Sequence, residues 1–150
     1  MVVLENKIYV YKFADLKLVE SIDTCSNVSG LVALNTDGTN EVLATPDKES
    51  GHVRIALYHK NKNHIIKAHE NTITCLALNP DGRILATSSQ KGTLIRLFNT
   101  ASGNTLTELR RGSGSANIFA IAFDRKTNWV AVTSDRSTIH VFAISKEIIE

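Results

Sequence analysis

Two adjacent arginines, Arg110 and Arg111, are the residues of this chain best suited to bind an anion. They follow a short run of residues, 105–109, that predicts a β-strand. Successive side chains of a strand point to opposite faces, so the two guanidinium groups cannot serve the same site. Guanidinium suits phosphate because its planar fork donates two parallel, charge-assisted hydrogen bonds. The pair therefore predicts two separate anion sites, one on each side of the sheet that carries it.

The apolar segments around the arginine pair repeat along the chain. LVALN at residues 31–35 returns as CLALN at 75–79 and as AIAFD at 120–124, at spacings of 44 and 45 residues. Turn residues and further short alternating segments follow each copy. These segments are residues 42–45, 52–55 and 64–67 in the first repeat, 84–87, 93–98 and 105–109 in the second, and 130–133 and 138–142 in the third, with 7–11 and 17–20 matching an earlier repeat.

Four strands in a period of about 45 residues are typical of one blade of a β-propeller. Turn-forming residues punctuate the chain and the apolar runs are short and β-branched, which disfavours helix throughout. The sequence thus predicts an all-β chain, a β-propeller fragment of roughly three to three and a half four-stranded blades. The expected blades are residues 1–27 (the end of one blade), 28–68, 69–112 and 113–150 (incomplete).

The length of 150 residues is short for a closed propeller. Propellers have roughly four to eight blades, and at this period the chain supplies little more than three. We therefore expect part of a longer ring, whose terminal sheets present unpaired strand edges that favour association. An open solenoid or a ring assembled from several chains is the alternative.

Composition narrows the classes of function. The 17 basic and 15 acidic residues nearly balance, which disfavours a nucleic-acid partner, and no apolar run is long enough for a membrane-spanning helix. Cys25 and Cys75 lack metal-ligand spacing, so we predict neither a metal site nor a cofactor. No phosphate-binding loop or nucleophile motif is present, and we do not expect an enzyme.

Three segments resemble the PROPPIN family, seven-bladed β-propellers that bind phosphoinositides in autophagy. Leu109-Arg110-Arg111-Gly112 is similar to the family's Phe-Arg-Arg-Gly sequence, with residues 91–100 (KGTLIRLFNT) before it and 134–142 (SDRSTIHVF) after it. The resemblance covers most of residues 28–144 and implies that the blades belong to a seven-bladed ring. Leu109 replaces the family's Phe, at a position that we expect to point toward packing.

The resemblance also implies the ligands and the residues that hold them. The family binds phosphatidylinositol 3-phosphate and phosphatidylinositol 3,5-bisphosphate in two pockets, one on each side of the blade with the arginine pair. The first pocket would consist of His69, Ser89, Thr93, Arg96 and Arg110. The second would consist of Arg111, Thr133, Ser134, Thr138 and His140. An alternative role for Arg96 is to pair with a neighbouring carboxylate such as Glu108.

The resulting hypothesis is a scaffold recruited in autophagy to membranes that carry 3-phosphoinositides. It would be cytoplasmic, peripherally bound to autophagic, endosomal or vacuolar/lysosomal membranes, with autophagy scaffold and lipid-transfer proteins as partners. In the family a membrane-inserting loop follows the third strand of the last blade present here, and it would begin near residues 148–150. The alternative is a propeller that binds acidic or phosphorylated peptides through the same arginines.

Overall fold

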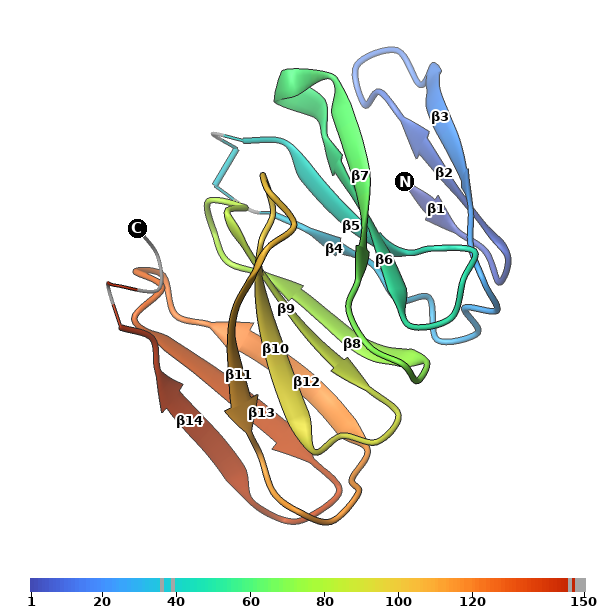
Figure 1. The fold of residues 1–150 in the computed structure, drawn as a ribbon. Helices are drawn as coiled ribbons and strands as arrows, with labels where there is room; N and C mark the ends of the chain where they lie inside the picture. Colours follow the sequence, from blue (N-terminus) through green and yellow to red (C-terminus); the bar gives the residue numbers. More distant parts are fainter. Residues whose placement is uncertain (36, 39, 146, 148–150) are drawn as a thin grey trace.

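The computed structural model of the chain describes residues 1–35, 37–38, 40–145 and 147, which form four antiparallel β-sheets (Figure 1). We number the sheets 1 to 4 in chain order. Their strands are β1 (Val2–Val3), β2 (Lys7–Tyr11) and β3 (Leu18–Asp23) in sheet 1; β4 (Ala33–Leu34), β5 (Val42–Pro46), β6 (His52–Leu57) and β7 (Lys62–Lys67) in sheet 2; β8 (Ile73–Leu78), β9 (Ile84–Ser89), β10 (Leu94–Asn99) and β11 (Thr105–Arg110) in sheet 3; and β12 (Ile118–Phe123), β13 (Trp129–Ser134) and β14 (Ile139–Ala143) in sheet 4. Consecutive strands are hydrogen-bonded neighbours within each sheet. This is the arrangement of consecutive propeller blades, so the predicted all-β propeller fold is confirmed.

The short strand β1 was not predicted from the sequence. It pairs Val2 with Tyr9 and Val3 with Ile8 of β2, and two residues are too few to show an alternating pattern. A single 3-10 turn, η1 (Tyr58–Lys60), lies between β6 and β7. No helix in the described part of the chain is long and apolar enough to cross a bilayer. Residues 148–150, where the membrane-inserting loop would begin, lie outside the described residues.

Apolar side chains fill the spaces between successive sheets, which follow one another in chain order in Figure 1. Strand β8 contacts both β4 and β12, so sheet 3 packs between its two neighbours. The core between sheets 2 and 3 includes Val53, Ile55, Ile66, Ile73, Leu85 and Phe98. The core between sheets 3 and 4 includes Ile84, Ile95, Leu97, Ile121, Val130 and Val132. Sheet 3 therefore buries both faces, as its continuous apolar runs require.

The far face of sheet 4 is also apolar. Phe119, Trp129, Ile139 and Val141 are 68%, 51%, 70% and 59% exposed there, whereas Val130 and Val132 on the near face are fully buried. Exposure alternates with the pleat, but hydrophobic character does not. Sheet 4 thus has the composition of a sheet built to pack on both sides.

Two turn glycines determine how the chain passes from one sheet to the next. Gly51 precedes β6 with a φ of +80°, and a Cβ there would overlap the carbonyl oxygen of His69. Gly92 precedes β10 with a φ of +63°, and a Cβ there would overlap the carbonyl oxygen of Ala116. The amide of His69 in turn donates to the Gly51 carbonyl at 3.0 Å, and that of Ala116 donates to Lys91 at 3.2 Å. The loops that leave sheets 2 and 3 are therefore each held against a turn of the same sheet, where only glycine fits.

We expect Gly92→Ala to lower the free energy of unfolding by about 2 kcal/mol or more, because both the positive φ and the backbone overlap must be relieved. Gly38→Ala is the matched control, since Gly38 has a similar φ of +71° but no atom within 4 Å of a built Cβ. The control should cost only about 1 kcal/mol. Urea denaturation measures both values, and equal losses would show that the close approach at Gly92 is unimportant.

Candidate anion-binding site

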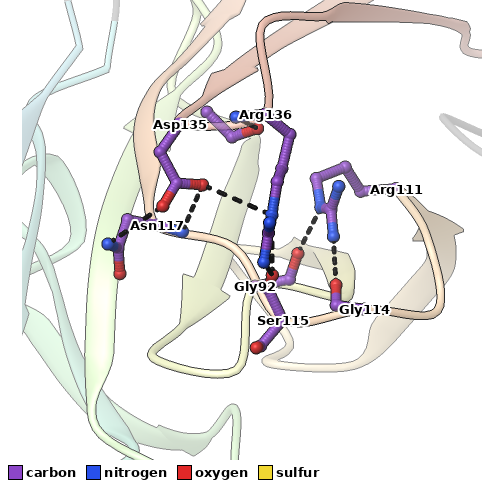
Figure 2. A network of polar contacts seen from close by, with 8 residues as sticks. Gly92, Arg111, Gly114, Ser115, Asn117, Asp135 and Arg136 are labelled. Atoms are coloured by element: carbon purple, nitrogen blue, oxygen red, sulfur yellow. Dashed lines mark hydrogen bonds and ion pairs between the residues drawn. The ribbon is translucent and has the colours of Figure 1, made fainter.

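The two arginines at the end of β11 lie on different sides of sheet 3. Leu109 pairs with Ile95 of β10 and packs with it in the core shared with sheet 4. Arg110 pairs with Leu94 and therefore lies on the opposite face, toward sheet 2. Arg111 follows the strand and points to the loop that leads to sheet 4 (Figure 2). The prediction that Leu109 contributes to packing is confirmed.

A cleft of about 200 Å³ opens beside sheet 3 on the side of Arg110. Its walls come from β9, β10, the turn between them and the loop that precedes β8. The lining residues are His69, Glu70, Asn71, Ser89, Lys91, Thr93, Leu94 and Arg96. Four of the five residues predicted for the first pocket therefore come together here. Arg110 is exposed and does not line the cleft itself, but it pairs across the strands with the lining residue Leu94.

Arg96 is held by groups of two sheets. Its Nη1 donates to the carbonyl oxygen of Ala68, in the loop that leaves sheet 2, at 2.7 Å. Its Nε donates to the Glu108 carboxylate at 3.2 Å, and the two residues are also cross-strand partners in β10 and β11. The alternative role of Arg96, as the partner of Glu108, is confirmed. The carboxylate offsets much of the positive charge that Arg96 brings to the cleft.

His69 is buried, with an exposed fraction of 7%, and its Nε2 hydrogen-bonds the Thr87 hydroxyl at 2.8 Å. Burial and the nearby Arg96 cation lower the pKa of His69 to about 4. The ring is therefore neutral at pH 7 and offers a hydrogen bond but no charge to the cleft. Thr87 pairs with Arg96 across β9 and β10, so all three side chains lie on one face.

Several residues at the cleft were missed by the sequence analysis. Thr87 was missed because a β-branched residue inside a strand is usually part of the core. It does lie on the same face of β9 as the predicted Ser89, two positions further on. Lys91 and Asn71 are exposed loop residues whose proximity depends on the packing of the loop before β8 against sheet 3. Lys91 lies in the same turn as Thr93, and this short spacing was the one indication in the sequence that Lys91 lies at the cleft. Lys91 adds a cation where Arg96 is already paired.

The loop between β11 and β12 is held by two arginines through backbone carbonyls. Arg111 donates from Nε to Gly92 at 2.6 Å and from Nη2 to Gly114 (Figure 2). Arg136, in the turn after β13, donates from Nε and Nη2 to the Ser115 carbonyl at 3.1 and 2.6 Å. Arg111 thus uses two of its five N–H groups to brace the loop. The guanidinium groups of Arg111 and Arg136 place positive charge along this loop, and we refer to it as the cationic edge between sheets 3 and 4.

An acidic group next to this edge orients the loop that enters sheet 4. The Asp135 carboxylate accepts hydrogen bonds from the Asn117 amide N–H at 3.1 Å and from the Asn117 side chain at 3.2 Å. The same carboxylate pairs with Arg136 at 3.8 Å. Arg111 is not part of this ion pair, so its positive charge is less compensated than that of Arg136 (Figure 2).

Two residues predicted for the second pocket lie on the side of Arg111. His140 pairs with the buried Val132, which belongs to the core between sheets 3 and 4. Ser134 is buried on the same face of β13, two positions beyond Val132. The Nδ1 atom of His140 is buried and has no hydrogen-bond partner among the described residues, while its ring stacks on Phe142 with centroids 6.2 Å apart.

The remaining two residues of that set are placed differently. Thr138 is exposed and directly precedes β14. Thr133 pairs with Ile139, which is 70% exposed on the far face of sheet 4. The alternation of β13 therefore separates Thr133 from Ser134 and does not bring it to the side of Arg111. The family resemblance placed both hydroxyls in one pocket, but the pleat puts them on opposite faces of the sheet.

The position of Arg96 has counterparts in the neighbouring sheets. Arg54 pairs with Thr45 in sheet 2 as Arg96 pairs with Thr87 in sheet 3, and His140 pairs with Val132 in sheet 4. Each of these third-strand side chains faces the preceding sheet. The partners of these side chains differ. Arg54 donates to the Glu20 carboxylate at 3.0 Å, and Tyr58 donates to the same carboxylate. The Nδ1 atom of His140 has no hydrogen-bond partner among the described residues. Burial and Glu20 also raise the pKa of Tyr58.

The fold and this geometry define consecutive blades of a β-propeller with cationic and hydroxyl groups at the seams between them. The sequence profile of the PROPPIN family matches residues 1–148. Arabidopsis thaliana autophagy-related protein 18e is 41% identical over 149 residues, which cover 99% of this chain and 40% of that protein. The chain belongs to the PROPPIN family and spans about 40% of the length of the curated relatives it matches.

Solved structures agree with this family assignment. Kluyveromyces lactis Hsv2 superimposes with a TM-score of 0.83 at 27% identity, over 96% of this chain and 46% of that chain. The complex of KlAtg21 with the coiled coil of AgAtg16 gives a TM-score of 0.79 at 28% identity, over 96% of this chain and 49% of that chain. The four sheets are therefore similar to just under half of a PROPPIN propeller.

The buried His69 predicts a loss of stability in mild acid. In the unfolded chain His69 takes up a proton near pH 6.5, but in the folded chain it does so only near its pKa of about 4. The folding free energy contributed by the neutral ring is thus complete above pH 6.5 and declines by on the order of 3 kcal/mol as the pH falls to 4. Urea denaturation at pH 7, 5.5 and 4.5 measures this decline.

His69→Gln is the matched control, because the amide can keep a hydrogen bond to Thr87 but does not titrate. We expect this variant to lose less stability between pH 6.5 and 4 than the wild type. The same decline in both proteins would place its origin at another group.

Proposed function

We propose that this chain carries the phosphoinositide-binding sites of a membrane-recruited scaffold in autophagy. The ligands would be phosphatidylinositol 3-phosphate and phosphatidylinositol 3,5-bisphosphate. The observation that supports this most directly is the placement of Arg110 and Arg111 on opposite sides of sheet 3. Buried or half-buried hydroxyl and imidazole groups lie on each of these sides, His69, Ser89 and Thr93 on one and Ser134 and His140 on the other. A phosphomonoester carries about −1.5 to −2 charges and three acceptor oxygens, so it needs both cations and neutral donors.

In the first site the neutral donors come from the cleft and the charge comes from its rim. Ser89 and Thr93 are buried residues, with exposed fractions of 6% and 8%, and both line the cleft. Because Arg96 is paired with Glu108, the cations that remain for a phosphate are Arg110 and the previously unpredicted Lys91. His69 and Arg96 would mainly shape the wall of the site. A headgroup phosphate held this way bridges the rim and the hydroxyls.

In the second site Arg111 would supply the charge while it continues to brace its loop. Its remaining N–H groups can donate to a phosphate without breaking the bonds to Gly92 and Gly114. Ser134, Thr138 and the Nδ1 atom of His140 would complete the set, and a ligand would give that buried nitrogen a partner. Thr133 would not contact the same headgroup, because it lies on the far face.

The proposed cellular role follows from the relatives. Those with the name autophagy-related protein 18 support a role in autophagy, and the KlAtg21 complex shows a family relative bound to a coiled coil of AgAtg16. We propose a non-catalytic protein of the cytoplasm, peripherally bound to autophagic, endosomal or vacuolar/lysosomal membranes. Autophagy scaffold and lipid-transfer proteins are its proposed partners. Binding of acidic or phosphorylated peptides by the same arginines is the competing function.

Replacing both arginines tests the lipid-binding function. We expect Arg110→Thr/Arg111→Thr to bind vesicles containing phosphatidylinositol 3-phosphate at least about tenfold more weakly than the wild type, because both sites lose their principal cation. Flotation with phosphatidylcholine vesicles, with and without the phosphoinositide, measures this. Circular dichroism should change little, since Arg110 is exposed and Arg111 only braces a loop.

The matched control is Arg83→Thr/Arg125→Thr, which removes the same charge from exposed turns before β9 and between β12 and β13. This control should float like the wild type. If the Arg110/Arg111 variant also floats like the wild type, or if the wild type binds only a phosphorylated peptide, the lipid-binding function is wrong.

The single substitutions distinguish two sites from one. Arg110→Thr or Arg111→Thr alone should halve the number of soluble inositol 1,3-bisphosphate molecules bound, as measured by calorimetry, and leave the affinity of the other site unchanged. Vesicle binding should fall much more, because two headgroups in one membrane act together through a high effective concentration. A single variant that loses all binding of the soluble headgroup would indicate one shared pocket.

A further inference from the structure

The loop between β11 and β12 projects from the molecule between two fixed ends. At its start the Arg111 amide donates to the carbonyl of Thr93 at 3.0 Å, and at its end the Ala116 amide donates to Lys91 at 3.2 Å. Residues 113–115 between these anchors are exposed. A Cβ built at Gly112 or Gly114 would meet no atom within 4 Å, so the space around this part of the loop is open.

The sequence of this loop places a serine at a defined distance from the arginine pair. Ser113 has Arg110 three residues before it and Arg111 two residues before it, in the sequence Arg-Arg-Gly-Ser. Serine kinases with an acidic substrate groove select arginines at these two positions, because each guanidinium pairs with a carboxylate of the kinase. Ser115 is exposed in the same loop but stands two residues too far from the pair. It therefore serves as an internal control.

We propose that Ser113 is a phosphorylation site for a kinase of this arginine-directed class, and that its phosphate closes the anion site at Arg111. The first part stands on the loop and its sequence, and the second rests on the proposed function. In the reaction the Ser113 Oγ attacks the γ-phosphorus of ATP. The Oγ–P bond forms as the bond to the leaving ADP oxygen breaks, and the hydroxyl proton passes to the base of the kinase.

The contacts of Arg111 explain why a phosphate at this position would close the site. Arg111 Nη2 already donates to the carbonyl of Gly114, the residue next to Ser113 (Figure 2). A phosphate on Ser113 would thus lie within reach of the same guanidinium, with three strong acceptors in place of one carbonyl. It would occupy the donors that a headgroup needs and repel an anionic membrane. Arg110 faces sheet 2 and remains available to the first site.

The modification itself is tested without lipid. The chain is incubated with the purified catalytic subunit of cAMP-dependent protein kinase and ATP, and intact mass and peptide fragmentation locate the phosphate. We expect one phosphate on the wild type and on Ser115→Ala, and none on Ser113→Ala. A phosphate on Ser115, or an unmodified chain when a synthetic peptide of residues 107–118 is phosphorylated, would overturn the assignment of Ser113.

The consequence is tested on the singly phosphorylated chain. We expect it to bind one inositol 1,3-bisphosphate where the unmodified chain binds two, and to float about tenfold more weakly with vesicles containing phosphatidylinositol 3-phosphate. Kinase-treated Ser113→Ala should behave like the untreated wild type. Equal binding by the phosphorylated and unmodified chains would overturn the closure of the Arg111 site. An unmodified chain that binds neither probe would contradict the proposed function instead, and the mass measurement of Ser113 would stand.

Discussion

The contact between a turn glycine and the loop that leaves its sheet is the constraint on which the site depends. At Gly51 the contact places the His69 backbone over sheet 2, and at Gly92 it places Ala116 and the loop before it over sheet 3. Because no Cβ separates the two backbones, each of these two loops is held in a fixed position against its sheet before it crosses to the next one. The buried imidazole of the first cleft and the braced loop at Arg111 are positioned by this same contact, which occurs once in sheet 2 and once in sheet 3.

The net positive charge at the two anion sites is smaller than the number of basic side chains around them suggests. Arg96 is paired with Glu108, Arg136 is paired with Asp135, and burial keeps His69 neutral. Among the described residues at the site, the cations without an ion-pair partner are therefore Arg110 and Arg111, one on each side of sheet 3, and Lys91, which lines the cleft on the side of Arg110. This distribution favours recognition by a few well-placed donors over general attraction to any polyanion.

Local patterns in the sequence were sufficient for the longer strands, though not for the two-residue β1, and for the opposite orientation of Arg110 and Arg111. Period-two alternation is a property of the strand alone. The packing of Leu109 follows from the same alternation. The sequence was insufficient wherever tertiary packing decides. The hydrogen bond of Thr87 to His69 and the carbonyl contacts of Arg111 join segments from different loops or sheets. Thr133 shows a further limit, since the family resemblance grouped it with Ser134 and the pleat places the two side chains on opposite faces.

Side chains at the same register position have different partners in sheets 2, 3 and 4. Arg54 donates from Nη2 to Glu20 at the first seam, and Arg96 donates to a carboxylate and a carbonyl at the second. Arg54 Nη1 and, at the third seam, His140 Nδ1 are buried without a hydrogen-bond partner among the described residues. A ligand entering the first seam would compete with the ion pair between Arg54 and Glu20, whereas at the third seam it would meet an imidazole nitrogen without a partner among the described residues. The same register position of one repeated fold can thus hold a structural ion pair in one sheet and present a hydrogen-bonding group to a ligand in another, and the difference requires only another residue or partner at that position.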